Sequence, residues 1–205
     1  MSARFITLEG GEGAGKSTHL QSIGSWLESR GHTVVLTREP GGTALGEAVR
    51  DVLMADHGSP MPAMSELLLM FAARAAHLQQ VIEPALAAGK WVISDRFTDA
   101  SYAYQGAARG LGDAAVATLE QLVQGERRPD RVLLFDLPPA QGLARRGRAG
   151  DTNRFDNETQ AFHAAVTDAY HRRARQNPER YAIIDASAAR ADVSARIRAI
   201  LESLT

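Results

Sequence analysis

Short apolar runs recur along the chain, separated by longer stretches with helical periodicity. The runs are rich in β-branched residues and lack the polar alternation of a half-exposed strand, which is typical of parallel strands covered on both faces. They are FITLE (5–9), TVVLT (33–37), WVISD (91–95), RVLLFD (131–136) and YAIID (181–185). We therefore predict a strand at each of these positions.

The stretches between the apolar runs favour helices. The predicted helices cover residues 16–30, 45–54, 65–88, 113–125, 159–177 and 190–204. Gly31 and Gly89 stand where a left-handed C-terminal cap belongs, just before a strand. This alternation of strand and helix predicts a doubly wound α/β sheet.

Length and composition agree with one compact domain. The chain has 205 residues, 44% of them hydrophobic and 23% charged, enough for a sizeable core. No internal repeat, low-complexity segment or linker divides it. We therefore expect a single domain over residues 1–205.

The net charge of the chain does not indicate a particular class of binding partner. A formal net charge of -1 argues against a broad basic surface for nucleic acid, so any phosphate must bind at a local cluster. The chain has no cysteine, which fits a reducing compartment. It begins without a signal-like segment and has no long apolar run. We expect a cytoplasmic protein with no nucleic-acid or membrane partner.

The first apolar run leads into a glycine-rich segment that carries one lysine. Gly10-x-x-x-x-Gly15-Lys16-Ser17 follows a predicted strand and opens a predicted helix, the context of a phosphate-binding loop. Its backbone N–H groups would cradle phosphate, Lys16 would reach the β and γ phosphates, and Ser17 would offer its hydroxyl to Mg²⁺. The predicted nucleotide-binding residues are Gly10, Gly11, Glu12, Gly13, Ala14, Gly15, Lys16, Ser17 and Thr18. Such a loop favours a nucleotide, with ATP as the expected co-substrate.

A second polar cluster ends the predicted strand 91–95. Asp95 and Arg96 lie where open α/β sheets bind ligands. Asp95 could hold Mg²⁺ or orient an acceptor, and Arg96 could clamp an acceptor phosphate. A guanine-reading Asn-Lys-x-Asp motif is absent, since neither Lys16 nor Lys90 follows an asparagine, so a GTPase switch loses most of its support.

Four motifs together resemble the thymidylate kinase family. They are LEGGEGAGKST, TREPGGT (37–43), LLLMFAARAAHL (67–78) and SDRFTDASYAYQGAARG (94–110), in family order. The resemblance extends from the first strand to the C-terminal helix. It implies a P-loop nucleoside monophosphate kinase fold, with a five-stranded parallel sheet ordered 2-3-1-4-5, and transfer of the γ-phosphate of ATP to dTMP with Mg²⁺.

The resemblance also implies which residues bind the acceptor. Arg74 and Gln105 would read the thymine base, a role that suits groups able to match carbonyl oxygens and an N–H. Phe71 could stack on the base, although many relatives carry the aromatic one position earlier, where Met70 stands. The other implied contacts are Ser101 beside the base, Tyr104 against the sugar, and Arg38, Glu39 and Arg96 around the acceptor phosphate and sugar.

With a carboxylate, Glu12, in its phosphate-binding loop, the chain resembles the bacterial kind of thymidylate kinase, which supplies arginine from a mobile lid. The segment 142–158 is rich in arginine and glycine, as that resemblance requires. The lid departs from the family spacing at the arginine that touches the transferring phosphate. Arg148, one position earlier, is the expected substitute for that arginine, and Arg146 is the alternative. The predicted catalytic residues are Lys16, Asp95, Arg148, Arg146 and Glu12.

We predict that the protein phosphorylates dTMP to dTDP with ATP and Mg²⁺, by positioning and charge neutralisation. Ser17 and Asp95 are the expected metal ligands. The family further implies a homodimer, in which Ala- and Leu-rich helices such as 65–88 could pack across a two-fold axis. The alternatives are a kinase for another nucleoside monophosphate and a non-catalytic nucleotide switch.

Overall fold

The computed structural model describes residues 3–149 and 154–204, and the side chains of residues 148 and 149 lie outside that description. A five-stranded parallel sheet forms its centre, in the order β2-β3-β1-β4-β5. The strands are β1 (Phe5–Glu9), β2 (Val34–Arg38), β3 (Trp91–Asp95), β4 (Arg131–Asp136) and β5 (Tyr181–Asp185). The predicted fold and strand order are confirmed, with β2 shifted by one residue.

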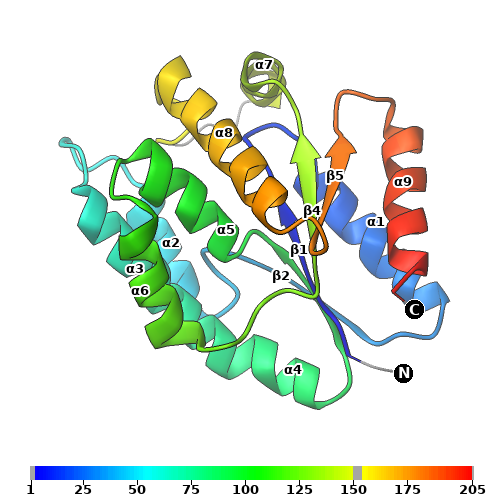
Figure 1. The fold of residues 1–205 in the computed structure, drawn as a ribbon. Coiled ribbons are helices and arrows are strands. Elements are labelled where there is room, and N and C mark those ends of the chain that lie inside the picture. Colours follow the sequence, from blue (N-terminus) through cyan, green and yellow to red (C-terminus); the bar gives the residue numbers. More distant parts are fainter. Residues whose placement is uncertain (1–2, 150–153, 205) are drawn as a thin grey trace.

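Helices cover both faces of this sheet (Figure 1). Helices α1 (Lys16–Ser29) and α9 (Arg190–Glu202) lie on one side. The other side carries α2 (Ala44–Met54), α3 (Ala63–His77), α6 (Asp113–Gln124) and α8 (Gln160–Gln176). The remaining helices are α4 (Glu83–Ala87), α5 (Thr98–Ser101), α7 (Pro139–Ala149) and the π-helical turns η1 (Leu78–Ile82) and η2 (Tyr102–Ala108).

All six predicted helices are present, with ends that differ by a few residues. The predicted helix 65–88 is a continuous run of α3, η1 and α4. Gly31 and Gly89 have φ values of 85° and 75°, as left-handed caps require. Helices α5 and η2 were not predicted, because the sequence of residues 98–108 indicates only a binding motif. The full length of α7 was not predicted either.

Alternating side chains of each central strand enter different core clusters. Ile6 and Leu8 of β1 pack on the α1 and α9 side, whereas Phe5 packs with η1 and α4 on the other. In β4, Leu133 joins the first of these clusters and Leu134 joins a cluster with η2 and α8. The two-residue period of a strand thus builds both faces of the core.

The edge strands are less covered than predicted. Every residue of β2 is at least partly exposed, and Ile183 in β5 is 50% exposed. Both strands lie at the margins of the sheet, where the helical layers reach them incompletely. No helix within the described ranges has both the length and the apolar character needed to cross a membrane.

Candidate active site

A cavity of about 710 Å³ opens at the carboxyl ends of the strands. The phosphate-loop residues 12–18 line one side of it. Arg38, Asp95 and Arg96 line it from the ends of β2 and β3, and Tyr104 and Gln105 line it from η2. The chain thus brings four separate sequence motifs to one cavity, where ligands of open α/β sheets bind.

The phosphate loop is shaped by glycines in conformations that other residues rarely adopt. Gly10, Gly13 and Gly15 have φ values of 135°, 67° and 87°. A Cβ atom added to Gly13 would lie 2.0 Å from the carbonyl oxygen of Gly142 in α7. The loop therefore packs directly against the stem of the predicted lid, which explains a glycine at both positions.

Lys16 is folded onto its own loop. Its Nζ donates hydrogen bonds to the carbonyl oxygens of Gly10 (2.9 Å) and Gly11 (2.8 Å). Burial, together with the charge of Arg96, lowers the pKa of Lys16 to about 8, although nearby carboxylates partly oppose this shift. Both hydrogen-bond partners are neutral carbonyl groups, so a bound polyphosphate would supply an anionic hydrogen-bond partner to this buried ammonium group.

Ser17 and Asp95, both predicted as metal ligands, are in contact. The Ser17 hydroxyl donates to Asp95 Oδ2 at 2.7 Å. The other carboxylate oxygen, Oδ1, is buried and has no hydrogen-bond partner among the described residues. A hydroxyl and a carboxylate are hard oxygen donors of the kind that Mg²⁺ prefers, and Mg²⁺ takes its other ligands from water and phosphate.

Glu12 and Arg96 form an ion pair inside the cavity. Arg96 Nη2 lies 2.7 Å from Glu12 Oε1, and the Tyr104 hydroxyl donates to the same oxygen at 2.9 Å. Burial alone would raise the pKa of Glu12, but Arg96, Lys16 and Tyr104 outweigh it and lower the pKa to about 2. Arg96 has a φ of 72°, a strained value of the kind that collects at functional sites.

A buried carboxyl behind this pair was missed by the sequence analysis. Glu9, at the end of β1, accepts hydrogen bonds from the backbone N–H of Phe97 and from the Tyr170 hydroxyl, both at 2.8 Å. Burial and the charge of Asp99 raise its pKa to about 8. The signal was a glutamate at the end of an apolar run, but Tyr170, its partner in α8, is 161 residues away.

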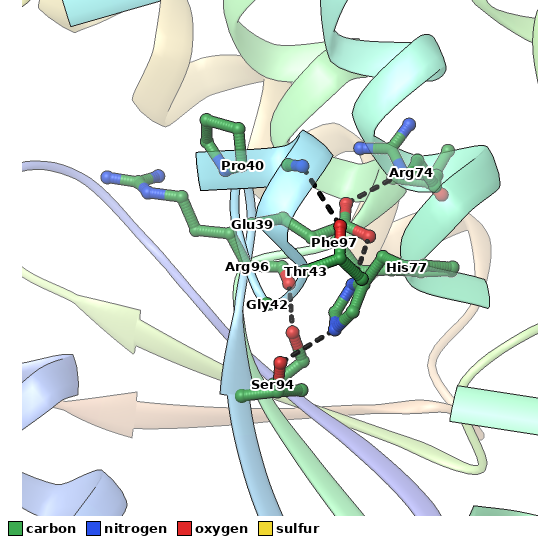
Figure 2. Close-up of polar contacts among 12 residues, drawn as sticks. Glu39, Pro40, Gly42, Thr43, Arg74, His77, Ser94, Arg96 and Phe97 are labelled. Atoms are coloured by element: carbon green, nitrogen blue, oxygen red, sulfur yellow. Dashed lines mark hydrogen bonds and ion pairs between the residues drawn. The ribbon is translucent and has the colours of Figure 1, made fainter. Parts of the chain in front are cut away.

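Arg74 is held in a buried network rather than standing free in the cavity (Figure 2). Its Nε donates to Glu39 Oε2 at 2.7 Å, and its Nη2 donates to Ser101 Oγ at 3.1 Å. His77 Nδ1 lies 2.9 Å from Glu39 Oε1, and its Nε2 lies 2.6 Å from Thr37 Oγ1. This network joins the end of β2 to α3.

Phe71 lies beneath the Arg74 guanidinium, whose carbon is 4.5 Å from the ring centroid. Its ring packs with Leu67, Tyr102 and Val116 in the core. Among the described residues that line the cavity, Met70 is present and Phe71 is not. A contact of Phe71 with the base therefore stays a prediction, and Met70 is the better placed of the two.

Gln105 lines the cavity and is tied to a carboxylate that the sequence analysis did not identify. Its Nε2 donates to Glu66 Oε1 at 2.7 Å. Glu66 is fully buried and also pairs with Arg109 and Arg154. Arg154 was assigned to the lid, but it points to α3, as its contact with Glu66 at 2.6 Å shows.

Arg38 from β2 and Arg50 from α2 both line the cavity. Arg38 is exposed and pairs with Glu47 at 2.8 Å. Arg50 donates to the carbonyl oxygen of Pro40 at 3.1 Å. Arg50 was not predicted, since a single arginine within the amphipathic pattern of α2 resembles a solvated surface charge.

The lid arginines are described in part. Arg145 and Arg146 of α7 line the cavity. Arg145 donates to the carbonyl oxygen of Ala186 at 3.0 Å, and Arg146 Nε lies 3.3 Å from Asp156 Oδ2. The side chain of Arg148 lies outside the described residues. Which arginine meets the transferring phosphate stays a prediction.

Comparison with known proteins identifies the family. The family model described as "Thymidylate kinase" matches residues 8–197. The chain is 55% identical over 204 residues to the thymidylate kinase of Ectopseudomonas mendocina, covering 100% of this chain and 97% of the relative. It is 50% identical over 204 residues to that of Alcanivorax borkumensis, covering 100% of this chain and 98% of the relative.

A solved structure agrees with these sequences. The crystal structure of thymidylate kinase from Ehrlichia chaffeensis matches with a TM-score of 0.79 and 32% identity, and the match covers 98% of this chain and 99% of that chain. Family model, sequence relatives and fold therefore concur over nearly the full length. The chain belongs to the thymidylate kinase family.

Proposed function

We propose that this thymidylate kinase, which phosphorylates dTMP to dTDP, carries out the transfer in the cavity between the phosphate loop and η2, with ATP as donor and Mg²⁺ as metal. One observation carries this assignment. A phosphate loop and three acceptor motifs, far apart in the sequence, line the same cavity of about 710 Å³. Such a cavity can hold two substrates with their phosphates facing each other.

On the donor side, residues 10–18 would bind the ATP phosphates. Backbone N–H groups of the loop and the N-terminus of α1 favour negative charge there. Lys16 would leave its carbonyl partners for the β and γ phosphates. Ser17 and Asp95 would hold Mg²⁺, which supplies charge neutralisation on the phosphate oxygens when it is bound.

On the acceptor side, Arg74, Gln105 and Ser101 would contact the base, and Tyr104 the sugar. Arg38, Glu39 and Arg96 would surround the acceptor phosphate and sugar, with Arg96 the best placed because it faces Glu12 beside the loop. Glu12 would keep the Arg96 guanidinium oriented between the two phosphates. The transfer needs no covalent enzyme intermediate, so these residues act by position and charge.

The lid arginines Arg146 and Arg148 are the proposed source of charge for the transferring phosphoryl group. Arg146 has support in its place on the cavity wall. Steady-state kinetics of single alanine variants at 145, 146 and 148 test the assignment. The lid residue in contact should lose about 10²- to 10³-fold in kcat with little change in the KM for ATP. No large loss in any variant would remove the lid from catalysis.

A coupled assay of ADP release against a panel of nucleoside monophosphates tests the substrate assignment. dTMP should give the highest kcat/KM, and Mg²⁺ removal by a chelator should abolish turnover. Faster turnover of another monophosphate would contradict the assignment, and ATP binding without transfer to any acceptor would favour a nucleotide switch.

We further propose a single domain over residues 1–205, a cytoplasmic location and a homodimer. Support for the dimer comes from large apolar side chains that are exposed on α2 and α3. These two helices lie side by side in Figure 1. They are Leu45, Val52, Met64 and Leu68. Light scattering of the purified protein should give the mass of two chains, and the Leu68→Glu variant should give the mass of one.

A further inference from the structure

One nitrogen of the buried Arg74 guanidinium group has no hydrogen-bond partner within the described part of the chain. Glu39 accepts from its Nε and Ser101 from its Nη2. The third nitrogen, Nη1, is buried and has no hydrogen-bond partner among the described residues. Arg74 itself is fully buried. A guanidinium group only donates, so this site offers a hydrogen-bond donor to whatever lies against it.

Gln105 is left with one free acceptor. Its Nε2 donates to Glu66 Oε1 at 2.7 Å, while its Oε1 is buried and has no partner among the described residues. An ionised carboxylate only accepts hydrogen bonds. Glu66 therefore requires the NH₂ end of the amide to face it, which turns the carbonyl end the other way.

Glu66 is itself held in place from two sides. Arg154 Nη2 lies 2.6 Å and Arg109 Nη2 lies 3.3 Å from its Oε2. Arg109 also pairs with Glu158 at 2.6 Å. Glu66 Oε1 accepts from Gln105 Nε2 at 2.7 Å and, at the longer distance of 3.4 Å, from Arg109 Nε, and the side chain is fully buried in α3. Two guanidinium groups thus stabilise the charged, acceptor-only form of Glu66.

We propose that Glu66 is a positioning residue that sets base selectivity by fixing the direction of the Gln105 amide. This inference rests on the proposed function, in which Arg74 and Gln105 contact the base. Arg74 bonds Ser101 and Gln105 lies four residues later on the same α5–η2 segment. A donor at Arg74 and an acceptor at Gln105 match the O4 carbonyl and N3–H of thymine.

Cytosine presents the opposite pattern at the same edge. It carries an amino group in place of O4 and a bare nitrogen in place of N3–H. Against Arg74 and Gln105, donor would meet donor and acceptor would meet acceptor, and both buried groups would stay unpaired. Sites built on buried hydrogen bonds reject such analogues strongly. If the amide of Gln105 could turn, its NH₂ would pair with the cytosine nitrogen and much of this rejection would be lost.

The test is kcat/KM for dTMP, dUMP and dCMP with the wild type and Glu66→Gln. A neutral amide at 66 can donate to Gln105 Oε1, so it no longer dictates the amide direction. The dTMP/dCMP ratio of kcat/KM should fall at least about tenfold. The dTMP/dUMP ratio should stay within about threefold, because uracil has the same donor and acceptor edge. General damage to the fold would lower all three rates together and leave both ratios unchanged.

Glu120→Gln is the matched control. Glu120 is also a buried carboxylate with an arginine partner, Arg128 at 2.9 Å, and it also contacts η2 through the Tyr102 hydroxyl at 2.5 Å. It has no hydrogen bond to Gln105 among the described contacts, so both ratios should keep their wild-type values. If Glu66→Gln does not fold, the double variant Glu66→Gln/Arg154→Gln keeps the local charge balanced and carries the same test.

Gln105→Met separates this inference from the proposed function. If Gln105→Met and Glu66→Gln both reduce the dTMP/dCMP ratio, the inference stands. If Gln105→Met reduces the ratio and Glu66→Gln does not, the positioning role of Glu66 is wrong while the base site remains. If Gln105→Met leaves the ratio unchanged, Gln105 does not read the base, and the proposed base site fails with it.

Discussion

The two ends of the cavity are built in different ways. The phosphate loop is one contiguous segment whose backbone groups would do most of the proposed binding, and Ser17 and Thr18 are exposed. The proposed base end depends on polar side chains from separate elements that contact one another, with Glu39 4%, Arg74 0% and His77 0% exposed. A change in the loop should therefore affect ATP binding and catalysis with little effect on stability, whereas a change at the base end should affect acceptor binding and stability together.

The largest expected effect is on stability at the base end. Arg74→Ala would leave the Glu39 carboxylate buried without its guanidinium partner, and breaking a buried pair in this way costs about 3–5 kcal/mol. The free energy of unfolding by urea measures it. Arg38→Ala is the control, because the Arg38–Glu47 pair is solvent-exposed, and it should cost no more than about 1 kcal/mol. Similar losses in both variants would contradict the comparison.

A change in the phosphate loop should give the reverse result, a large loss of activity with little loss of stability. Lys16→Ala removes the charge that would bridge the β and γ phosphates, so kcat should fall at least about 10²-fold, equivalent to about 3 kcal/mol. Stability should hardly fall, because burial already disfavours the charged lysine. Lys90→Ala, at the only other lysine, should leave kcat unchanged. Near-normal turnover by folded Lys16→Ala protein would remove Lys16 from the transfer.

This contrast also explains what the sequence could predict. The strands followed from apolar runs such as residues 91–95, and the phosphate loop from residues 10–17, because each depends on neighbours in the chain. The carboxylates Glu9 and Glu66 were missed because their partners are distant in the sequence, with a separation of 161 positions between Glu9 and Tyr170. Buried polar networks form only when the tertiary structure closes.

The choice between Met70 and Phe71 was unpredictable for a related reason. One residue turns an α-helix by about 100°, so adjacent positions face different surroundings. Both side chains fit an apolar helix face in sequence. Only the packing of α3 places Met70 on the cavity and Phe71 in the core.

A pH-dependent effect concerns Glu9, the buried carboxyl at the end of β1. Its pKa is raised to about 8 by burial and by Asp99, against an ordinary value of 4.5. Between these values the folded state keeps a proton that the unfolded state has lost, so stability should fall as pH rises from about 4.5 to 8, by up to about 1.4 kcal/mol per pH unit.

Glu9→Gln should remove this contribution, since an amide does not titrate. Urea unfolding of wild type and variant from pH 5 to 9 measures the difference between their stabilities. As pH rises to about 8, the free energy of unfolding of the wild type should fall relative to that of Glu9→Gln. Above pH 8 the difference between the two should stay constant. A constant difference over the whole range would show that Glu9 is ionised in the folded protein throughout.

The central claim is that donor and acceptor bind at separate ends of one cavity. Calorimetric titration of ATP and of dTMP, each alone, into Lys16→Ala and Gln105→Met tests it most directly. Lys16→Ala should weaken ATP binding at least about tenfold and leave the Kd for dTMP within about threefold, and Gln105→Met should do the opposite. If each variant weakens both ligands equally, the two ends do not divide the substrates as this account requires.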